Sequence, residues 1–315
     1  MAPLNTRTAG VIDPILSTHA RGYRNANFIS HLIFPRVPVP SRSMTVIRFG
    51  KDAFRKARTK RGPGATVGRV NFGYGAETIA LEQEALDAQV PREFLQEADK
   101  GPSINLSRLA INRLLSVHDL NLEYDTAQLA RLPANYNANN RIALAGGDRW
   151  TSPTSTPDED IDNGKDAVRR MIGQDPNTLT LGPTAFKALK RHPKIQEKFK
   201  YTSSSSITVD MLASYFEIER VLVGKAVYLP ENAADDAPAI DVWGDDAILS
   251  HVAEGSEDFG QPSYGYTYEL QASPLVEQAI WESDTRSWIH PTTIDRKPLL
   301  VGADAGFLFQ NAGAA

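Results

Sequence analysis

The chain has 315 residues, a formal net charge of −4 and no cysteine. Without cysteine it forms no disulfide bond, thiolate zinc site, iron–sulfur cluster or cysteine nucleophile. The acidic balance argues against a dedicated nucleic-acid-binding protein, which normally carries an excess of basic residues. The length suits roughly two domains of ~150 residues each. No apolar run approaches the ~20 residues that span a bilayer, so we expect no membrane contact.

Residues 1–36 predict an N-terminal arm. Prolines interrupt this segment, and it shows little periodicity. The apolar residues between Ile12 and Phe34 are too many for a free tail. Two interpretations remain open, namely a partly ordered tail and an arm that folds against a neighbouring subunit.

Residues 37–80 predict a long extended loop. Two stretches rich in β-branched residues flank the turn Gly62-Pro63-Gly64, a pattern typical of a hairpin. Asp52 is the only acid on the approach to this turn, where the basic residues gather. The basic cluster consists of Lys51, Arg55, Lys56, Arg58, Lys60 and Arg61.

The basic cluster has three interpretations. A solvated loop needs no partner. A nucleic-acid contact would bind phosphates, but only Phe54 interleaves with the charges. A contact between subunits would need an acidic surface on the same chain, and we favour this third interpretation because the sequence offers one. The predicted acidic partner surface consists of Glu82, Glu84, Asp87, Glu93 and Glu97.

A helix interrupted at Pro91 is predicted for residues 81–99, and a much longer helix for Ile104–Leu132. The longer segment contains no proline or glycine. Its leucines and isoleucine recur at three-, four- and seven-residue steps, which places them in one apolar stripe. At ~1.5 Å per residue the helix would be about 40 Å long. We expect the stripe to pack against the chain's own long strands, including a predicted strand over Val276–Trp288.

His118 falls on the apolar stripe, and we interpret it as a structural histidine with a partner rather than a metal ligand. Beyond residue 150, short helices and strands alternate without regular βαβ units, which indicates an α+β fold. The sequence has no P-loop, and the GxGxxG, HExxH and GxSxG motifs are also absent.

Asp158, Asp160 and Asp162 form the remaining candidate site. Alternating carboxylates in a loop can supply the oxygen ligands of calcium. However, Gly164 comes one position too late for an EF-hand, and Arg169 stands where the loop's final glutamate would be. The other interpretation is structural, because acids at a helix N-terminus interact favourably with the helix dipole.

In order along the chain, these parts resemble the major capsid proteins of tailed bacteriophages, which have the Hong Kong 97-type fold. The resemblance rests on the succession of arm, extended loop, long helix and compact domain over nearly the whole chain. Four short sequence segments are also similar to segments of such proteins. They are GYRNANFISHLIFPRVPV, DPNTLTLGPTAFKALKRHPKI, TVDMLASYFEIERVLVGKAVY and KPLLVGADAGFLFQNA.

The resemblance implies an α+β capsid fold with four parts. Residues 1–36 would be the arm and 37–80 the extended loop (E-loop), which reaches over an adjacent subunit. Residues 81–149 and 272–297 would form a peripheral domain around a spine helix, residues 104–132. Residues 150–271 and 298–315 would form an axial domain around the capsomer axes.

The resemblance also implies a non-enzymatic function without a cofactor. The chain would assemble with itself into the hexamers and pentamers of an icosahedral virion shell. This shell would form in the host bacterial cytoplasm and enclose double-stranded DNA without sequence-specific binding. Scaffolding and portal proteins would be partners, with a decoration protein as a further candidate.

Two alternatives to a capsid protein remain at this point. One is a metal-dependent enzyme that uses Asp158, Asp160 and Asp162. The other is a nucleic-acid-binding protein that acts through residues 51–61.

Overall fold

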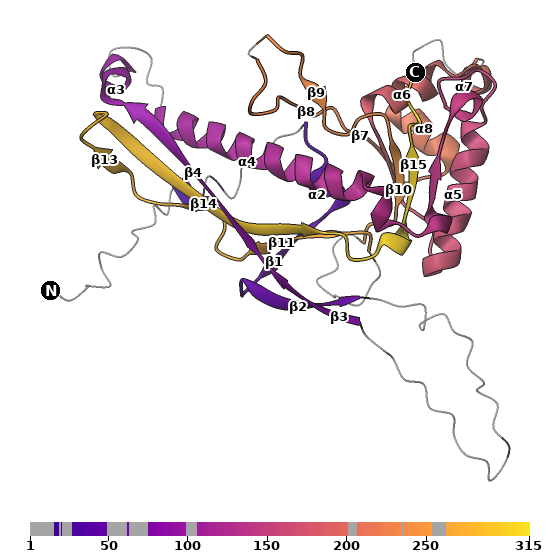
Figure 1. Cartoon of the computed structure of the whole chain (residues 1–315), viewed down its shortest axis with the longest axis horizontal. Helices are drawn as coiled ribbons and strands as arrows, with labels where there is room; N and C mark the ends of the chain where they lie inside the picture. Colours follow the sequence, from indigo (N-terminus) through magenta and orange to yellow (C-terminus); the bar gives the residue numbers. More distant parts are fainter. Residues whose placement is uncertain are drawn as a thin grey trace.

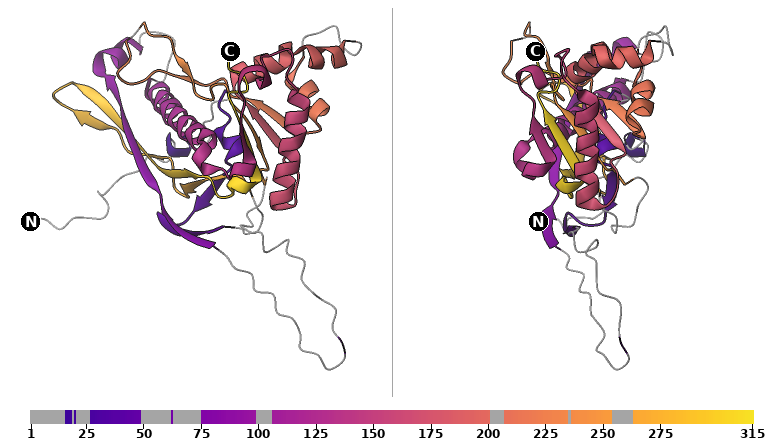
Figure 2. Two further views of the ribbon diagram at one scale, coloured as in Figure 1. Left: turned by 45° about the vertical axis from the view of Figure 1, so that its right-hand side comes forward. Right: turned by 90° about the vertical axis from the view of Figure 1, so that its right-hand side faces the viewer.

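The computed structural model describes residues 16–18, 20, 27–48, 62, 75–98, 106–200, 207–234, 236–253 and 263–315. The two larger β-sheets are separate, and the long helix α4 (Leu106–Arg131) lies along the first of them with its C-terminal end toward the second (Figure 1). The described part is broad in one view and narrow when turned by 90° (Figure 2). The arrangement is mixed α and β, as the sequence predicts.

The first sheet has six strands, and the 13-residue strand β14 (Ser287–Leu299) is its centre. All ten residues of β4 pair antiparallel with β14. β1 pairs parallel with β11, which in turn pairs with β14. The other strands of this sheet are β1 (Arg36–Val39), β4 (Glu82–Pro91), β11 (Tyr266–Leu270), β12 (Leu275–Val276) and β13 (Ile280–Glu282).

The helix predicted before Pro91 is wrong, because residues 82–91 form strand β4. Glu, Gln, Ala and Leu favour helices, but this preference is weak, and the packing context overrides it. The ladder to β14 satisfies the backbone of the whole segment, and Val90 is buried. Only the part after the proline is helical, as α3 (Arg92–Ala98).

The predicted long helix is confirmed as α4, which has 26 residues. Its buried face follows the predicted stripe, and Ile111 and Leu115 pack with Val276 and Ile294 of the first sheet. The single strand predicted over 276–288 is wrong. The chain reverses at residues 283–286, so β13 and the start of β14 form a hairpin in which Trp281 pairs with Trp288.

The second sheet has five strands in the order β5-β15-β10-β6-β7, covered by short helices. Helix α5 (Pro157–Ile172) approaches it so closely that a Cβ on Gly164 would lie 2.8 Å from the Phe309 ring. The strands are β5 (Arg141–Ala143), β6 (Thr178–Leu181), β7 (Arg220–Val223), β10 (Ala247–Ser250) and β15 (Gly306–Gln310). The other helices here are α6 (Pro183–Arg191), α7 (Pro193–Phe199) and α8 (Val209–Phe216).

Two small hairpins complete the fold. β2 (Ser43–Arg48) pairs with β3 (Gly75–Ala80), which confirms extended strands at the base of the predicted loop. β8 (Val227–Tyr228) pairs with β9 (Ile240–Asp241). The short helix α2 (Ser30–Ile33) packs on α4, so this part of the predicted arm folds on its own chain. Single-turn helices span Pro133–Asn135, Ala138–Asn140, Gly146–Asp148 and Ala303–Ala305.

The two sheets depart from the predicted domain boundaries at three strands. β1 belongs to the first sheet rather than to the extended loop, and β11 belongs to it rather than to the part around the second sheet. β5 joins the second sheet although it precedes residue 150. In each case the hydrogen-bonded neighbour comes from a distant part of the sequence, which composition alone does not reveal.

Ile111→Ala should lower the free energy of unfolding by about 2–5 kcal/mol, because it leaves a cavity between α4 and the first sheet. Ile111 is fully buried there. Urea denaturation of the unassembled subunit would measure the change.

Leu109→Ala on the same helix is the matched control. Leu109 is 58% exposed, so its loss should change stability by no more than about 0.5 kcal/mol. Equal effects of the two substitutions would show that the buried face of α4 is not what holds the helix to the sheet.

Candidate functional site

A partly buried network of charges fixes α4 on the first sheet. Glu84 of β4 accepts two hydrogen bonds from Arg296 of β14, from Nε at 3.1 Å and from Nη2 at 2.9 Å. His118 of α4 lies with Nδ1 3.0 Å from the same carboxylate. The side chains of Arg296 and His118 are only 2% and 1% exposed. Three elements therefore meet at one carboxylate, and the structural interpretation of His118 is confirmed.

The network continues from Arg296 toward the edge of the sheet. Its Nη1 lies 3.7 Å from Asp119 of α4, and it also donates to the carbonyl oxygen of His118. Arg36 of β1 lies 3.3 Å from Asp119 and 3.6 Å from Glu269 of β11. Alternating signs along this chain of contacts compensate the buried charges, which would otherwise be costly.

The pKa of Glu84 reflects its partners. Burial by itself raises this pKa, but the hydrogen bonds and charges of His118 and Arg296 outweigh burial and lower it to about 2. Nδ1 of His118 must carry a proton, because an ionised carboxylate only accepts hydrogen bonds. Glu84 is therefore ionised in the folded subunit even in mild acid.

A second buried carboxylate ties α4 to the N-terminal segment and to the second sheet. Glu123 is fully buried and accepts hydrogen bonds from the backbone nitrogens of Ile29 and Ser30. It also accepts from the indole nitrogen of Trp243 at 2.6 Å. At the end of α4, Nε of Arg131 donates to Asp246 at 2.7 Å. The segment 242–246, which leads into β10, is thus held at two points along α4.

The predicted acidic partner surface is not one continuous face. Glu84 is engaged within the chain, and Glu82 pairs with Lys297 at 2.6 Å. Because side chains alternate along a strand, Asp87 points to the opposite face from Glu82 and Glu84. Glu93 and Glu97 belong to α3. Whether the exposed acids contact another subunit stays a prediction.

The predicted basic cluster lies outside the described residues: Lys51, Arg55, Lys56, Arg58, Lys60 and Arg61. The structure does describe how the base of this loop is attached. Arg42, just before β2, donates to Asp295 of β14 at 3.0 Å, and Asp295 is only 1% exposed. The amide of Leu81 donates to the carbonyl of Arg42 at 2.8 Å. The two ends of the loop therefore start from a fixed point on the first sheet.

Asp158, Asp160 and Asp162 do not form a ligand loop. All three lie within α5, in which Asp158 and Asp160 belong to the first turn. Asp160 accepts a hydrogen bond from the Trp150 indole, and Asp162 pairs with Lys165. Across the described ranges, no group of three or more His, Asp or Glu side chains could hold a metal ion. The acids instead complement the dipole at the start of α5.

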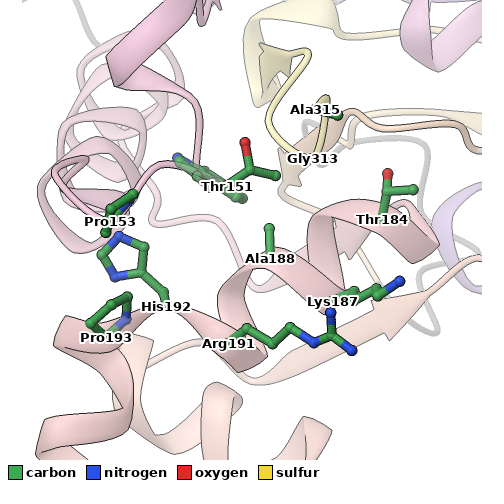
Figure 3. A pocket seen from close by; sticks show the side chains of 11 residues that line it. Thr151, Pro153, Thr184, Lys187, Ala188, Arg191, His192, Pro193, Gly313 and Ala315 are labelled. Atoms are coloured by element: carbon green, nitrogen blue, oxygen red, sulfur yellow. The ribbon is translucent and has the colours of Figure 1, made fainter.

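A pocket of about 490 Å³ opens beside α6 in the second-sheet part of the molecule (Figure 3). Trp150, Thr151, Ala188 and Gly313 contribute to its wall, and Lys187 and Arg191 line one side. Its lining residues contain none of the catalytic sequence motifs named above. None of the helices in the described part of the chain has the length and apolar character needed to cross a membrane.

Sequence reasoning did not predict that the carboxylates of Glu84 and Glu123 form contacts within the subunit. Glu123 follows directly after the stripe residue Leu122, and an acid beside an apolar stripe is the one local signal that could have identified it. Arg296 gave no such signal, because it meets Glu84 across 212 positions of sequence.

Glu84→Gln should make the subunit less stable at pH 7 by about 3 kcal/mol, because the buried Arg296 loses its charged partner. The folded pKa, about 2, lies below the ordinary value of 4.5. The stabilisation is therefore complete above pH 4.5 and is lost as the pH falls through 2. Urea denaturation at pH 7, 5 and 3 should show the variant approaching the wild type in acid.

Glu82→Gln, two residues earlier on the same strand, is the control for this pH dependence. Glu82 is 71% exposed in its pair with Lys297, and such surface pairs contribute about 0–1 kcal/mol. A gap between Glu84→Gln and the wild type that stays constant from pH 7 to pH 3 would contradict the assigned role of Glu84.

Comparison with known proteins agrees with this architecture. The family described as phage major capsid protein E matches residues 135–310. The major capsid protein of Burkholderia phage BcepMu is 34% identical over 304 residues, covering 95% of each chain. That of Pseudomonas phage JBD67 is 28% identical, covering 96% of this chain and 98% of its own.

Solved structures show the same relationship. A phage-related protein from Bordetella bronchiseptica is 40% identical with a TM-score of 0.84, covering 98% of this chain and 99% of its own. The mature capsid of bacteriophage PhiM1 has the same fold at 12% identity, with a TM-score of 0.54 and coverage of 92% and 88%. These matches support neither an enzyme nor a nucleic-acid-binding protein. The chain belongs to the phage major capsid protein family, with the Hong Kong 97-type fold, and is a structural component of the virion shell.

Proposed function

We propose that the chain forms the hexamers and pentamers of an icosahedral shell around the double-stranded DNA of a tailed phage. The observation that carries this proposal is the network of hydrogen bonds and charges centred on Glu84. It fixes the long helix to one sheet, while Glu123 and Arg131 attach the same helix to the segment that enters the other sheet. A subunit with two ends held at a set distance is suited to repeated use in a closed lattice.

The two ends would have different places in the shell. We assign the first sheet with α4 to the peripheral domain and the second sheet with α5–α8 to the axial domain. This keeps the predicted division but moves β1 and β11 to the peripheral part and β5 to the axial part. The sheets are separate hydrogen-bonded units, which supports treating each as the core of its own domain.

The extended loop would reach over an adjacent subunit. Its base is attached to the centre of the first sheet through Arg42 and Asp295, which supports a loop projecting in a set direction. The basic cluster in residues 51–61 would then meet acids of the neighbour. Glu84 is already used within its own chain, so the exposed acids Asp87 and Glu93 are the stronger candidates.

The remaining proposed partners are those that a tailed-phage shell needs for its assembly and completion. Scaffolding and portal proteins would act during assembly in the host bacterial cytoplasm, and a decoration protein would bind the finished surface. Packaged DNA would be enclosed without sequence-specific contacts. The net charge of −4 supports the absence of sequence-specific DNA contacts, because a dedicated DNA-binding chain would carry an excess of basic residues.

Replacing Arg55, Arg58 and Arg61 by glutamate should reduce particle yield strongly while leaving the subunit folded. Each exposed pair is worth only about 0–1 kcal/mol, but every subunit in the lattice repeats the loss. Electron microscopy of the assembled product would measure yield, and circular dichroism would test the fold.

Lysine at the same three positions is the control, because it preserves charge. Lysine variants should assemble in near-normal yield, and wild-type assembly should weaken in ~1 M salt, where the Debye length falls to ~3 Å. Normal particle yield from the glutamate variant would remove the basic cluster from the assembly contacts.

A further inference from the structure

Helices α6 and α7 carry a strongly basic surface that the charge of the whole chain conceals. Glu197 is the only acid in residues 187–200. The basic residues of this stretch are Lys187, Lys190, Arg191, Lys194, Lys198 and Lys200. We call the α6–α7 surface that bears them the basic face.

The basic face borders the pocket beside α6. Lys187 and Arg191 are one helical turn apart, so they lie on the same side of α6, and Figure 3 shows both extending along that side. Both are exposed. Within the residues that the structure describes, neither forms an ion pair with a carboxylate. The pocket is thus a hollow with both apolar and polar groups in its wall and the two cations at its side.

A matching surface of opposite charge lies on the hairpin of β8 and β9. No lysine, arginine or histidine occurs between Lys225 and His251. The hairpin also exposes large apolar side chains, with Val227 and Ile240 each 48% exposed and Leu229 44% exposed. Its acids in the described part of the chain are Glu231, Asp236 and Asp241. We call residues 227–241 the acidic hairpin.

The base of the acidic hairpin is held against α4. Tyr228 packs edge-on against Tyr124 of α4, with ring centroids 4.8 Å apart. Just after the hairpin, Trp243 donates to the buried Glu123. A Cβ on Gly224 would lie 2.1 Å from the Trp243 ring, so the chain entering the hairpin is packed closely as well. A surface positioned in advance loses little conformational entropy when it binds.

The two surfaces do not neutralise each other within one subunit. In Figure 1 the hairpin lies toward α4, whereas α7 lies at the outer end of the second-sheet part. The hairpin and α7 are also separated in Figure 2. No ion pair joins them among the described residues. Each surface therefore still offers its charge to a partner.

We propose that the acidic hairpin of one subunit docks on the basic face of the next, with its apolar side chains at the pocket beside α6. A contact between two different patches of identical chains is heterologous, and such contacts close into rings when the rotation allows. This inference rests on the proposed shell assembly and adds to it a second charged contact, separate from the extended loop. A nucleic-acid phosphate would match the cations but would leave the exposed apolar side chains of the acidic hairpin without a partner, which favours a protein partner.

The absence of cysteine permits a direct test by crosslinking. In shells assembled from a chain carrying both Lys187→Cys and Asp236→Cys, oxidation should join each subunit to its neighbour. Non-reducing gel electrophoresis should then show a ladder up to the size of the ring. Each single-cysteine variant is a control and should show no ladder. Absence of crosslinks, or dimers alone, would overturn the head-to-tail contact.

A charge exchange tests the same contact without oxidation. Lys187→Glu with Arg191→Glu should lower particle yield about tenfold, because like charges would then oppose each other across the interface. Glu231→Lys with Asp236→Lys should do the same. The chain carrying all four changes should recover most of the yield, and no recovery would overturn the proposal.

Further measurements distinguish the possible causes of a lower particle yield. Circular dichroism tests whether a variant subunit folds, and Lys187→Gln with Arg191→Gln replaces the reversal if it does not. The neutral pair should lower yield less than the glutamate pair does. If reversal of the basic face lowers the DNA content of particles but leaves their yield unchanged, the face contacts nucleic acid and the proposal is wrong.

Discussion

The carboxylate of Glu84 is the group on which the placement of the long helix depends. It accepts hydrogen bonds from Arg296 of β14, and it lies at hydrogen-bonding distance from His118 of α4. A buried ion pair adds little net stability over a hydrophobic pair, because desolvation offsets the attraction, but removal of one partner costs about 3–5 kcal/mol. The network therefore acts mainly on geometry. Apolar packing would let α4 slide along the sheet, whereas these charges have one satisfactory register.

The same reasoning extends from the first sheet to the second. Glu123 has its hydrogen-bond donors on a segment before β1 and on a loop before β10, so it connects parts of the chain that share no strand ladder. Arg131 repeats this arrangement at the end of the helix through Asp246. The apolar face of α4 contributes packing against the first sheet, and the polar contacts along the helix contribute the specificity. Its orientation is set at several points along its length rather than by a continuous apolar seam.

Sequence reasoning succeeded where the signal was local and failed where it depended on pairing. The long helix was predictable because proline and glycine are absent and Ile111 and Leu115 recur on one face. Strand β4 was not, since its residues favour a helix and only its ladder to β14 makes it a strand. The hairpin at Trp281 and Trp288 was read as one strand because alternation continues through its turn. The candidate site was the least predictable part, because Glu84 and Arg296 come together only in the folded sheet.

The distribution of charge separates the rigid interior of the subunit from its adjustable exterior. Interior carboxylates such as Glu84 and Glu123 have their hydrogen-bond donors on other elements of the same chain, so they hold the subunit's shape at neutral pH. Exposed charges such as Lys187 and Arg191 are screened by salt and individually weak. A shell built through weak contacts between rigid subunits can release a misplaced subunit before the lattice closes around it. Strong contacts between flexible subunits would instead preserve errors, so the firm interactions belong inside the chain and the weak ones between chains.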